Sequence, residues 1–175
     1  MNMNYKRVQG GASLPKVECT NPQAEKWLVR WDYQPYINEE GVEEGVTFVE
    51  QLFLHKPTLD EVKPIIIEYI NECVRQRIFS TLVWNGKPVW LSTENQMDWK
   101  AAFDRSLQTE GMNLPVKFKL GEDENGNSVY HTFTSLNAFA DFTDAWQRHI
   151  QQCLADGWQM KDSIDWDIYA NSTEL

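Results

Sequence analysis

The chain has few of the residues from which disulfide and metal sites are built. It contains three cysteines and three histidines in 175 residues. Cys19, Cys73 and Cys153 are far apart and form no CxxC pair, which is typical of reduced thiols in a cytoplasmic protein. No two histidines have the i, i+4 spacing of a helical zinc site. We therefore expect no metal and no cofactor, and surface or structural roles for the three histidines, His55, His131 and His149.

Basic charge and long apolar runs are also scarce. Sixteen Lys and Arg face 26 Asp and Glu, which gives a net charge of −10. A nucleic-acid-binding surface needs clustered cations, so this balance argues against such a partner. The apolar run Ile65–Ile67 stops at Glu68, whereas a membrane span needs about 18 apolar residues. The first residues also lack the apolar segment of a signal peptide. We expect neither a nucleic-acid nor a membrane partner.

Motifs of catalysis are missing as well. The sequence has no GxSxG, P-loop or GxGxxG pattern, and no cysteine stands in the context of a nucleophile. The acidic loop Gly121–Asn127 lacks the 12-residue pattern of an EF-hand and its closing Glu, so a hairpin turn is the better interpretation. Asp162 and Asp165 are interpreted as a solvated acidic edge, because carboxylates do acid–base work only when burial separates their pKa values. We therefore expect no catalytic residues and no enzyme.

Hydrophobic periodicity predicts an α+β fold. Residues 26–33 alternate between apolar and polar side chains, and residues 46–54 form a second strand, so residues 26–56 are predicted to be a β-hairpin lobe. Residues 1–25, rich in Gly and Pro, are predicted to be an extended N-terminal arm. Residues 57–175 are predicted to be an α+β domain. The expected order is an arm and β-hairpin, then helix, β-hairpin, helix, β-hairpin, helix.

Capping residues predict where the three helices begin. Thr58 with Glu61, and Thr93 with Gln96, have the spacing of a capping box. Ser135 precedes the apolar stripe of the third helix, and Gly157 is its predicted end. The first helix is expected to reach about Arg77 and to kink or restart at Pro64. Strands are expected over residues 114–120 and 129–134.

Asn85-Gly86 gives the strongest local prediction. This pair favours a two-residue type I′ turn, because both central residues need a positive φ. Trp84 and Trp90 flank the turn. Among the eight tryptophans, three lie on clear apolar faces and are expected in the core: Trp31, Trp99 and Trp146.

Tryptophans beside turns or helix ends are either core residues or interface anchors, since Trp is enriched among binding hot spots. If Trp84 lies near an exposed turn, it is the best single anchor, and otherwise it closes the core. The candidate interface consists of Trp84, Asn85, Gly86, Trp90 and Trp158.

Several segments carry a resemblance to a known group of proteins. They are Pro57–Lys63, Trp84–Gln96, Lys100–Asp104, Leu114–Lys119, His149–Ile150 and Gly157–Trp166, with Trp27–Asp32 and Gly45–Phe48 upstream. The chain resembles small phage and prophage proteins of gut bacteria that are encoded among tail genes. It is also similar to a domain of unknown function found in phage tail and tail-fibre proteins.

The resemblance implies a structural role and supplies no catalytic residues. It implies a bacteriophage tail or tail-fibre-attachment protein, made in the bacterial cytoplasm, that contacts other phage structural proteins and copies of itself. Tail-fibre relatives carry the domain on a longer chain with a shaft, which this chain lacks. A tail-fibre assembly chaperone is therefore an alternative. A carbohydrate-binding module or an enzyme is the alternative from a different class.

Overall fold

The computed structural model describes residues 5–11 and 14–171. The chain divides into two compact units, residues 1–69 with 163–175 (unit 1) and residues 70–162 (unit 2). The predicted boundary after residue 56 therefore differs from the observed division. Helix α1, Leu59–Ser80, supplies residues to both units, and the C-terminal segment belongs to unit 1, which sequence order does not reveal.

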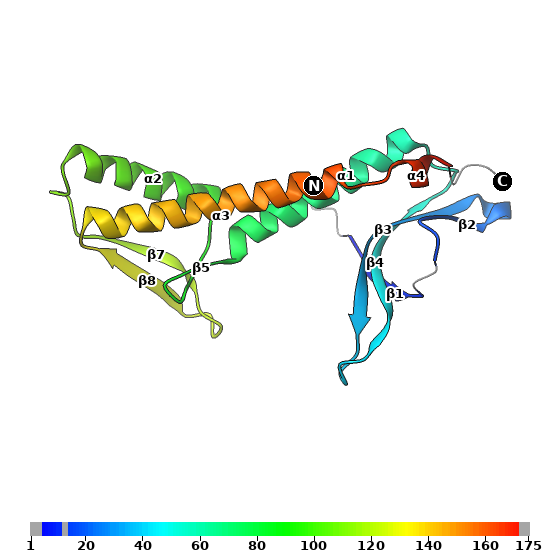
Figure 1. Ribbon diagram of the computed structural model, residues 1–175, viewed down its shortest axis with the longest axis horizontal. Helices are drawn as coiled ribbons and strands as arrows, with labels where there is room; N and C mark the ends of the chain where they lie inside the picture. Colours follow the sequence, from blue (N-terminus) through cyan, green and yellow to red (C-terminus); the bar gives the residue numbers. More distant parts are fainter. Residues whose placement is uncertain (1–4, 12–13, 172–175) are drawn as a thin grey trace. The chain divides into compact units, whose positions relative to one another are not determined.

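Unit 1 is built on a four-stranded antiparallel sheet in the order β1-β4-β3-β2 (Figure 1). The strands are β1 Arg7–Gly10, β2 Val17–Asn21, β3 Lys26–Ile37 and β4 Glu43–Phe53. A 3-10 turn, Pro22–Ala24, links β2 to β3, and the short helix α4, Asp167–Asn171, completes the unit. Residues 7–10 and 17–21, expected to belong to an arm, are instead the edge strands of this sheet.

The alternation predicted for β3 fails at its centre because Arg30 is buried. The Arg30 guanidinium lies 2.7 Å from the Glu18 carboxylate and 3.4 Å from that of Glu50. It also donates to the carbonyl oxygen of Pro15 at 3.0 Å. Buried charge is tolerated when it is paired and hydrogen-bonded. Asp32, with a φ of +53°, then interrupts the pairing of β3 with β4.

Unit 2 contains the predicted alternation of hairpins and helices. After α1 come β5 Leu82–Trp84, β6 Lys87–Val89, α2 Thr93–Gln108, β7 Val116–Glu122, β8 Ser128–Phe133 and α3 Leu136–Asp162. Asn85 and Gly86 have φ values of +49° and +72°, so the type I′ turn is confirmed. The predicted α+β class is confirmed too. No helix among the described residues is both long and apolar enough for a membrane span.

The helix starts agree with the capping predictions in two cases of three. The Glu61 carboxylate accepts the backbone N–H of Thr58 at 2.8 Å, and the Ser135 hydroxyl accepts that of Ala138 at 3.3 Å. The prediction for Thr93 is wrong by one residue, since Ser92 caps α2 and accepts the N–H of Asn95. α1 runs without interruption through Pro64 to Ser80.

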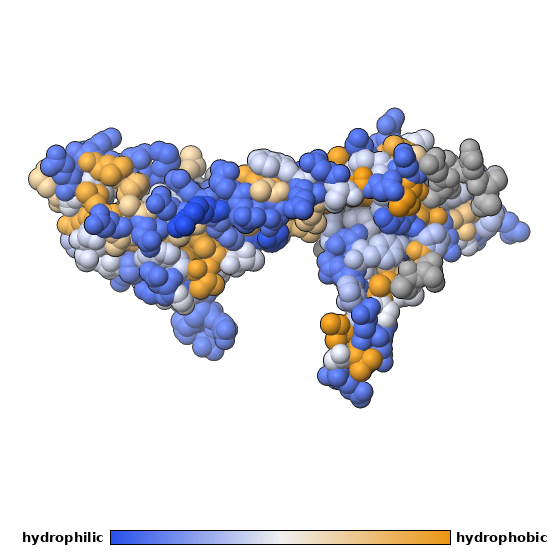
Figure 2. Space-filling model, viewed as in Figure 1, coloured by the Kyte–Doolittle hydropathy of each residue, from blue (hydrophilic) through white to orange (hydrophobic). Residues whose placement is uncertain are grey.

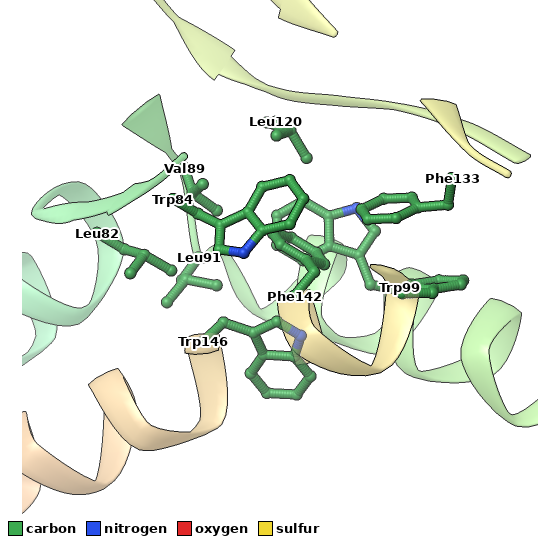
Figure 3. Packing of buried hydrophobic residues seen from close by; sticks show 10 residues of the cluster. Leu82, Trp84, Val89, Leu91, Trp99, Leu120, Phe133, Phe142 and Trp146 are labelled. Carbon is green, nitrogen blue, oxygen red and sulfur yellow. The ribbon is translucent and has the colours of Figure 1, made fainter. Parts of the chain in front are cut away.

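Aromatic side chains fill the core of unit 2. Phe133 stacks on Phe139 with ring centroids 4.5 Å apart, and Trp99 meets Phe142 edge to face at 5.0 Å. Figure 3 shows Trp99, Phe142 and Trp146 among the aliphatic residues of this cluster. Trp99 and Trp146 are buried here, and Trp31 is buried in unit 1, which confirms the core prediction for all three.

Gly157 lies inside α3 and does not end it. The helix continues to Asp162, and Gly157 is buried where α3 crosses α1. A Cβ added at Gly157 would lie 2.5 Å from Cγ2 of Val74. The glycine is therefore present because the two helices approach closely, and the prediction of a helix stop was wrong for that reason.

We expect Gly157→Ala to lower the free energy of unfolding of the chain. In an exposed helix this change stabilises by about 1 kcal/mol, but overpacking at a filled position costs about 1–3 kcal/mol. Urea denaturation measures the difference. In a Val74→Ala background, which removes the clashing methyl group, Gly157→Ala should become neutral or stabilising. A more stable Gly157→Ala single variant would contradict the close crossing.

Candidate interaction groove

Three adjoining hollows lie along the C-terminal half of α1 in unit 2. The largest, of about 460 Å³, lies between α1 and the start of α2. It shares Phe79 and Ser92 with a hollow of about 260 Å³ beside β7, and Arg75 and Ile78 with one of about 160 Å³ beside α3. Because neighbouring hollows share wall residues, we treat them together as the α1 groove.

One face of α1 lines the groove from end to end. Asn71, Val74, Arg75, Ile78 and Phe79 all contribute to it. Their spacing, i, i+3, i+4, i+7 and i+8, places them on a single stripe of a helix. The predicted helix ended near Arg77, so the sequence did not indicate that Ile78 and Phe79 belong to this stripe. The apolar pair just beyond the last expected turn was the signal that the helix continues.

The Trp90 end of the groove has a rigid backbone. Trp90 donates its N–H to the carbonyl of Leu120 at 2.8 Å, and Leu91 donates to that of Phe79 at 3.0 Å. Two side chains of α2 bond to the carbonyls of the same residues. The Asn95 amide donates to the Trp90 carbonyl at 2.8 Å, and the Gln96 amide donates to the Leu91 carbonyl at 2.7 Å. A wall held in this way loses little conformational entropy when a partner binds.

Two side chains lie close to the Trp90 ring. Phe79 stacks on the ring with centroids 5.9 Å apart and planes 29° apart, and the Lys119 ammonium lies 5.7 Å from the ring centre. Trp90 is half-buried and contributes to the apolar wall at this end of the groove.

Trp158 forms the other end of the groove and is 57% exposed. It follows Gly157, so the close crossing of α3 with α1 positions it. Lys161, one turn further on, donates to the Asn71 side chain at 2.5 Å. The groove is lined by three cations, Arg75, Lys119 and Lys161, and by one carboxylate, Glu72. Arg75 pairs with Glu72, and Lys119 pairs with Glu122, each at 2.7 Å. The excess positive charge of the groove therefore lies at Lys161.

Trp84 is a core residue and not an interface anchor. It is 6% exposed and packs edge to face on Phe142 with centroids 5.0 Å apart (Figure 3). Its indole N–H donates to the Asp141 carboxylate at 3.0 Å. Short strands and the tight turn place it inward. Asn85 and Gly86 are exposed at the turn and lie outside the α1 groove as defined above. Of the candidate interface residues, the structure brings Trp90 and Trp158 to the groove.

His131 and Lys87 form a polar pair beside Trp84. The Lys87 ammonium lies 3.1 Å from Nδ1 of His131, and the imidazole packs on the Trp84 ring with centroids 4.9 Å apart. Lys87 donates, so Nδ1 holds the lone pair in the neutral imidazole. Burial, and then the charge of Lys87, hold the pKa of His131 below its usual 6.5.

Cys153 and His149 are one helical turn apart on α3, but they are not arranged as a nucleophile and a base. Sγ of Cys153 lies 3.7 Å from Nε2 of His149, and the same Nε2 lies 3.2 Å from the carbonyl oxygen of Arg77. A carbonyl requires a donor, which assigns the proton to Nε2 and removes its ability to accept one from the thiol. Burial raises the pKa of the Cys153 thiol, which keeps it protonated. Across residues 5–11 and 14–171, no three His, Cys, Asp or Glu gather as metal ligands.

Comparison of the chain with protein-family models, with curated proteins and with solved structures finds no match in any of the three. The groove is therefore interpreted from its own geometry and chemistry.

We expect Trp84→Ala to destabilise the chain by about 3–5 kcal/mol, because truncating a buried Trp loses its transfer free energy and leaves a cavity. Trp158→Ala, at an exposed position, should leave the melting temperature within a few degrees of wild type. Thermal unfolding followed by circular dichroism compares the two variants. An unchanged melt for Trp84→Ala would show that Trp84 is not a core residue.

We expect an NMR titration to place the pKa of His131 below 6.5. Lys87→Met should raise it, without reaching 6.5, because burial remains. Lys100→Met, which removes an exposed Lys paired with Asp104 on α2, is the matched control and should not move it. Since the unfolded chain binds this proton more readily, stability falls as the pH drops from 6.5 toward the folded pKa. A wild-type pKa at or above 6.5 would contradict the burial.

Proposed function

We propose that the chain is a structural protein of a bacteriophage tail, or of the region where tail fibres attach, and that it acts by protein–protein contact without catalysis. The α1 groove is the contact surface. The observation that carries this proposal is the end of α1, where the apolar Ile78 and Phe79 stay partly exposed beside Arg75 in a groove with a rigid wall. A helix face of this kind is normally buried against another element.

The chemistry of the groove supports contact with a protein. Ile78 and Phe79 supply apolar surface, with Trp90 and Trp158 at the two ends. Aromatic residues and Arg are enriched in the centres of protein interfaces. The resemblance of the sequence to phage tail-region proteins supports the biological setting of that contact. It also supports the alternative of a tail-fibre chaperone, which would use the same surface during assembly.

Mass spectrometry of purified particles of the encoding phage or prophage separates a virion component from an assembly accessory. We expect the protein in mature particles in a fixed ratio to other tail proteins. If mature particles lack the protein while tail fibres fail to attach without it, the chaperone is correct. If particles and fibre attachment are both normal without it, both forms of the proposal are wrong.

Trp158→Ala should reduce incorporation into particles while the isolated protein keeps its melting temperature. Truncating an aromatic hot-spot residue typically costs about 2 kcal/mol or more of binding. Met97→Ala is the matched control, because Met97 is 67% exposed on α2 and does not line the groove. Equal incorporation of the two variants would show that the groove is not the contact surface.

A further inference from the structure

The tip of the β3–β4 hairpin in unit 1 combines exposed apolar side chains with unpaired carboxylates. Residues 37–44 define this hairpin tip. Ile37 is 61% exposed and Val42 53% exposed. The same segment contains Glu39, Glu40, Glu43 and Glu44 and no cation. Within the described part of the chain, none of these four carboxylates has an ion pair.

The hairpin tip is structurally defined and extends past the rest of its sheet (Figure 1). β1 pairs with β4 only over Val46–Val49, and β2 pairs with β3 over Lys26–Val29. The Asn38 side chain accepts the N–H groups of Glu40 at 3.0 Å and Val42 at 2.9 Å. Gly41, with a φ of +79°, completes the turn. Figure 2 shows hydrophobic and hydrophilic residues side by side at the end of this hairpin.

The α1 groove is complementary to the hairpin tip in charge and in polarity. With the Glu122 that pairs with Lys119 counted, the groove carries three cations against two carboxylates, and the tip carries four carboxylates. Apolar side chains accompany the charges on both surfaces, Ile37 and Val42 on the tip and Ile78 and Phe79 in the groove. Neighbouring strands lie about 4.8 Å apart, so the tip is a narrow ribbon of the kind that enters a groove along a helix.

We propose that the hairpin tip of one copy of this chain docks in the α1 groove of a second copy. This inference rests on the proposed function and names the partner of the same groove. The contact uses different surfaces on the two copies, so it is heterologous. Such contacts continue from copy to copy and produce a ring when the rotation closes or a filament when it does not. Both outcomes suit a repeating part of a phage tail.

Sedimentation velocity under reducing conditions tests the contact. Wild-type protein should associate more as its concentration rises. Association should weaken in about 1 M salt, where the Debye length falls to ~3 Å. Glu43→Lys/Glu44→Lys in the tip, and Lys119→Glu/Lys161→Glu in the groove, should each weaken association about tenfold or more, because like charges then meet across the contact. Glu110→Lys/Glu124→Lys, an equal charge change on exposed residues outside both surfaces, should associate at least as well as wild type.

Mixing the two defective variants gives the decisive result. The tip variant keeps an intact groove, and the groove variant keeps an intact tip, so one functional contact remains between them. The mixture should associate clearly more strongly than either variant does alone. Circular dichroism and melting curves establish that both variants are folded.

The inference is overturned if wild type stays monomeric up to its solubility limit, if the tip variant associates like wild type, or if the two variants do not combine. These outcomes are distinct from a failure of the proposed function. A monomeric protein found in purified virions would refute self-docking and leave the tail role intact. A self-associating protein missing from virions and unnecessary for fibre attachment would refute the tail role and leave the docking intact.

Discussion

The close crossing of α1 and α3 at Gly157 connects the helix packing of unit 2 with the shape of the α1 groove. With no side chain at Gly157, Val74 of α1 fits directly against the backbone of α3. The same approach brings Arg77 and Asp156 within 2.7 Å and sets Trp158 beside the stripe of α1. A bulkier residue at position 157 would push the two helices apart. That movement would loosen the packing of α3 on α1 and displace the wall of the groove that α3 forms. Stability and the shape of the contact surface therefore have a common origin.

Different interactions stabilise the interior of each unit. Unit 2 relies on stacked and edge-to-face rings, with indole nitrogen and carboxylate meeting at Trp84 and Asp141. Unit 1 buries a guanidinium, Arg30, between two carboxylates and a carbonyl, and Tyr169 of α4 donates to the Arg30 carbonyl at 3.1 Å. An aromatic core is stabilised by burial of apolar area, whereas a buried charge network is stabilising only while every partner is present. Removing a single partner of Arg30 therefore leaves a buried charge that is no longer fully compensated.

The sequence predicted what local chemistry determines and missed what long-range contact determines. Asn85-Gly86 specifies its turn because few residues adopt positive φ, and Ser135 specifies a helix start through its own hydroxyl. Gly157 was misread because a glycine after an apolar stripe has the same appearance at a helix end and at a helix crossing. Arg30 looked like a solvent-facing residue because its partners, Glu18 and Glu50, come from other strands. Trp90 and Trp158 were predicted as candidate interface residues. The groove that contains both is lined by α1, and the last turn of α1 lies beyond the end predicted for that helix.

The linker between β6 and α2 has one more consequence. The amide protons of Trp90 and Leu91 are bound to carbonyls of β7 and of α1, segments that are separated from the linker in sequence and from each other. Exchange of each proton with solvent therefore requires that the linker separate from β7 or from the end of α1. The two exchange rates thus report separately on the contacts that hold the linker in unit 2.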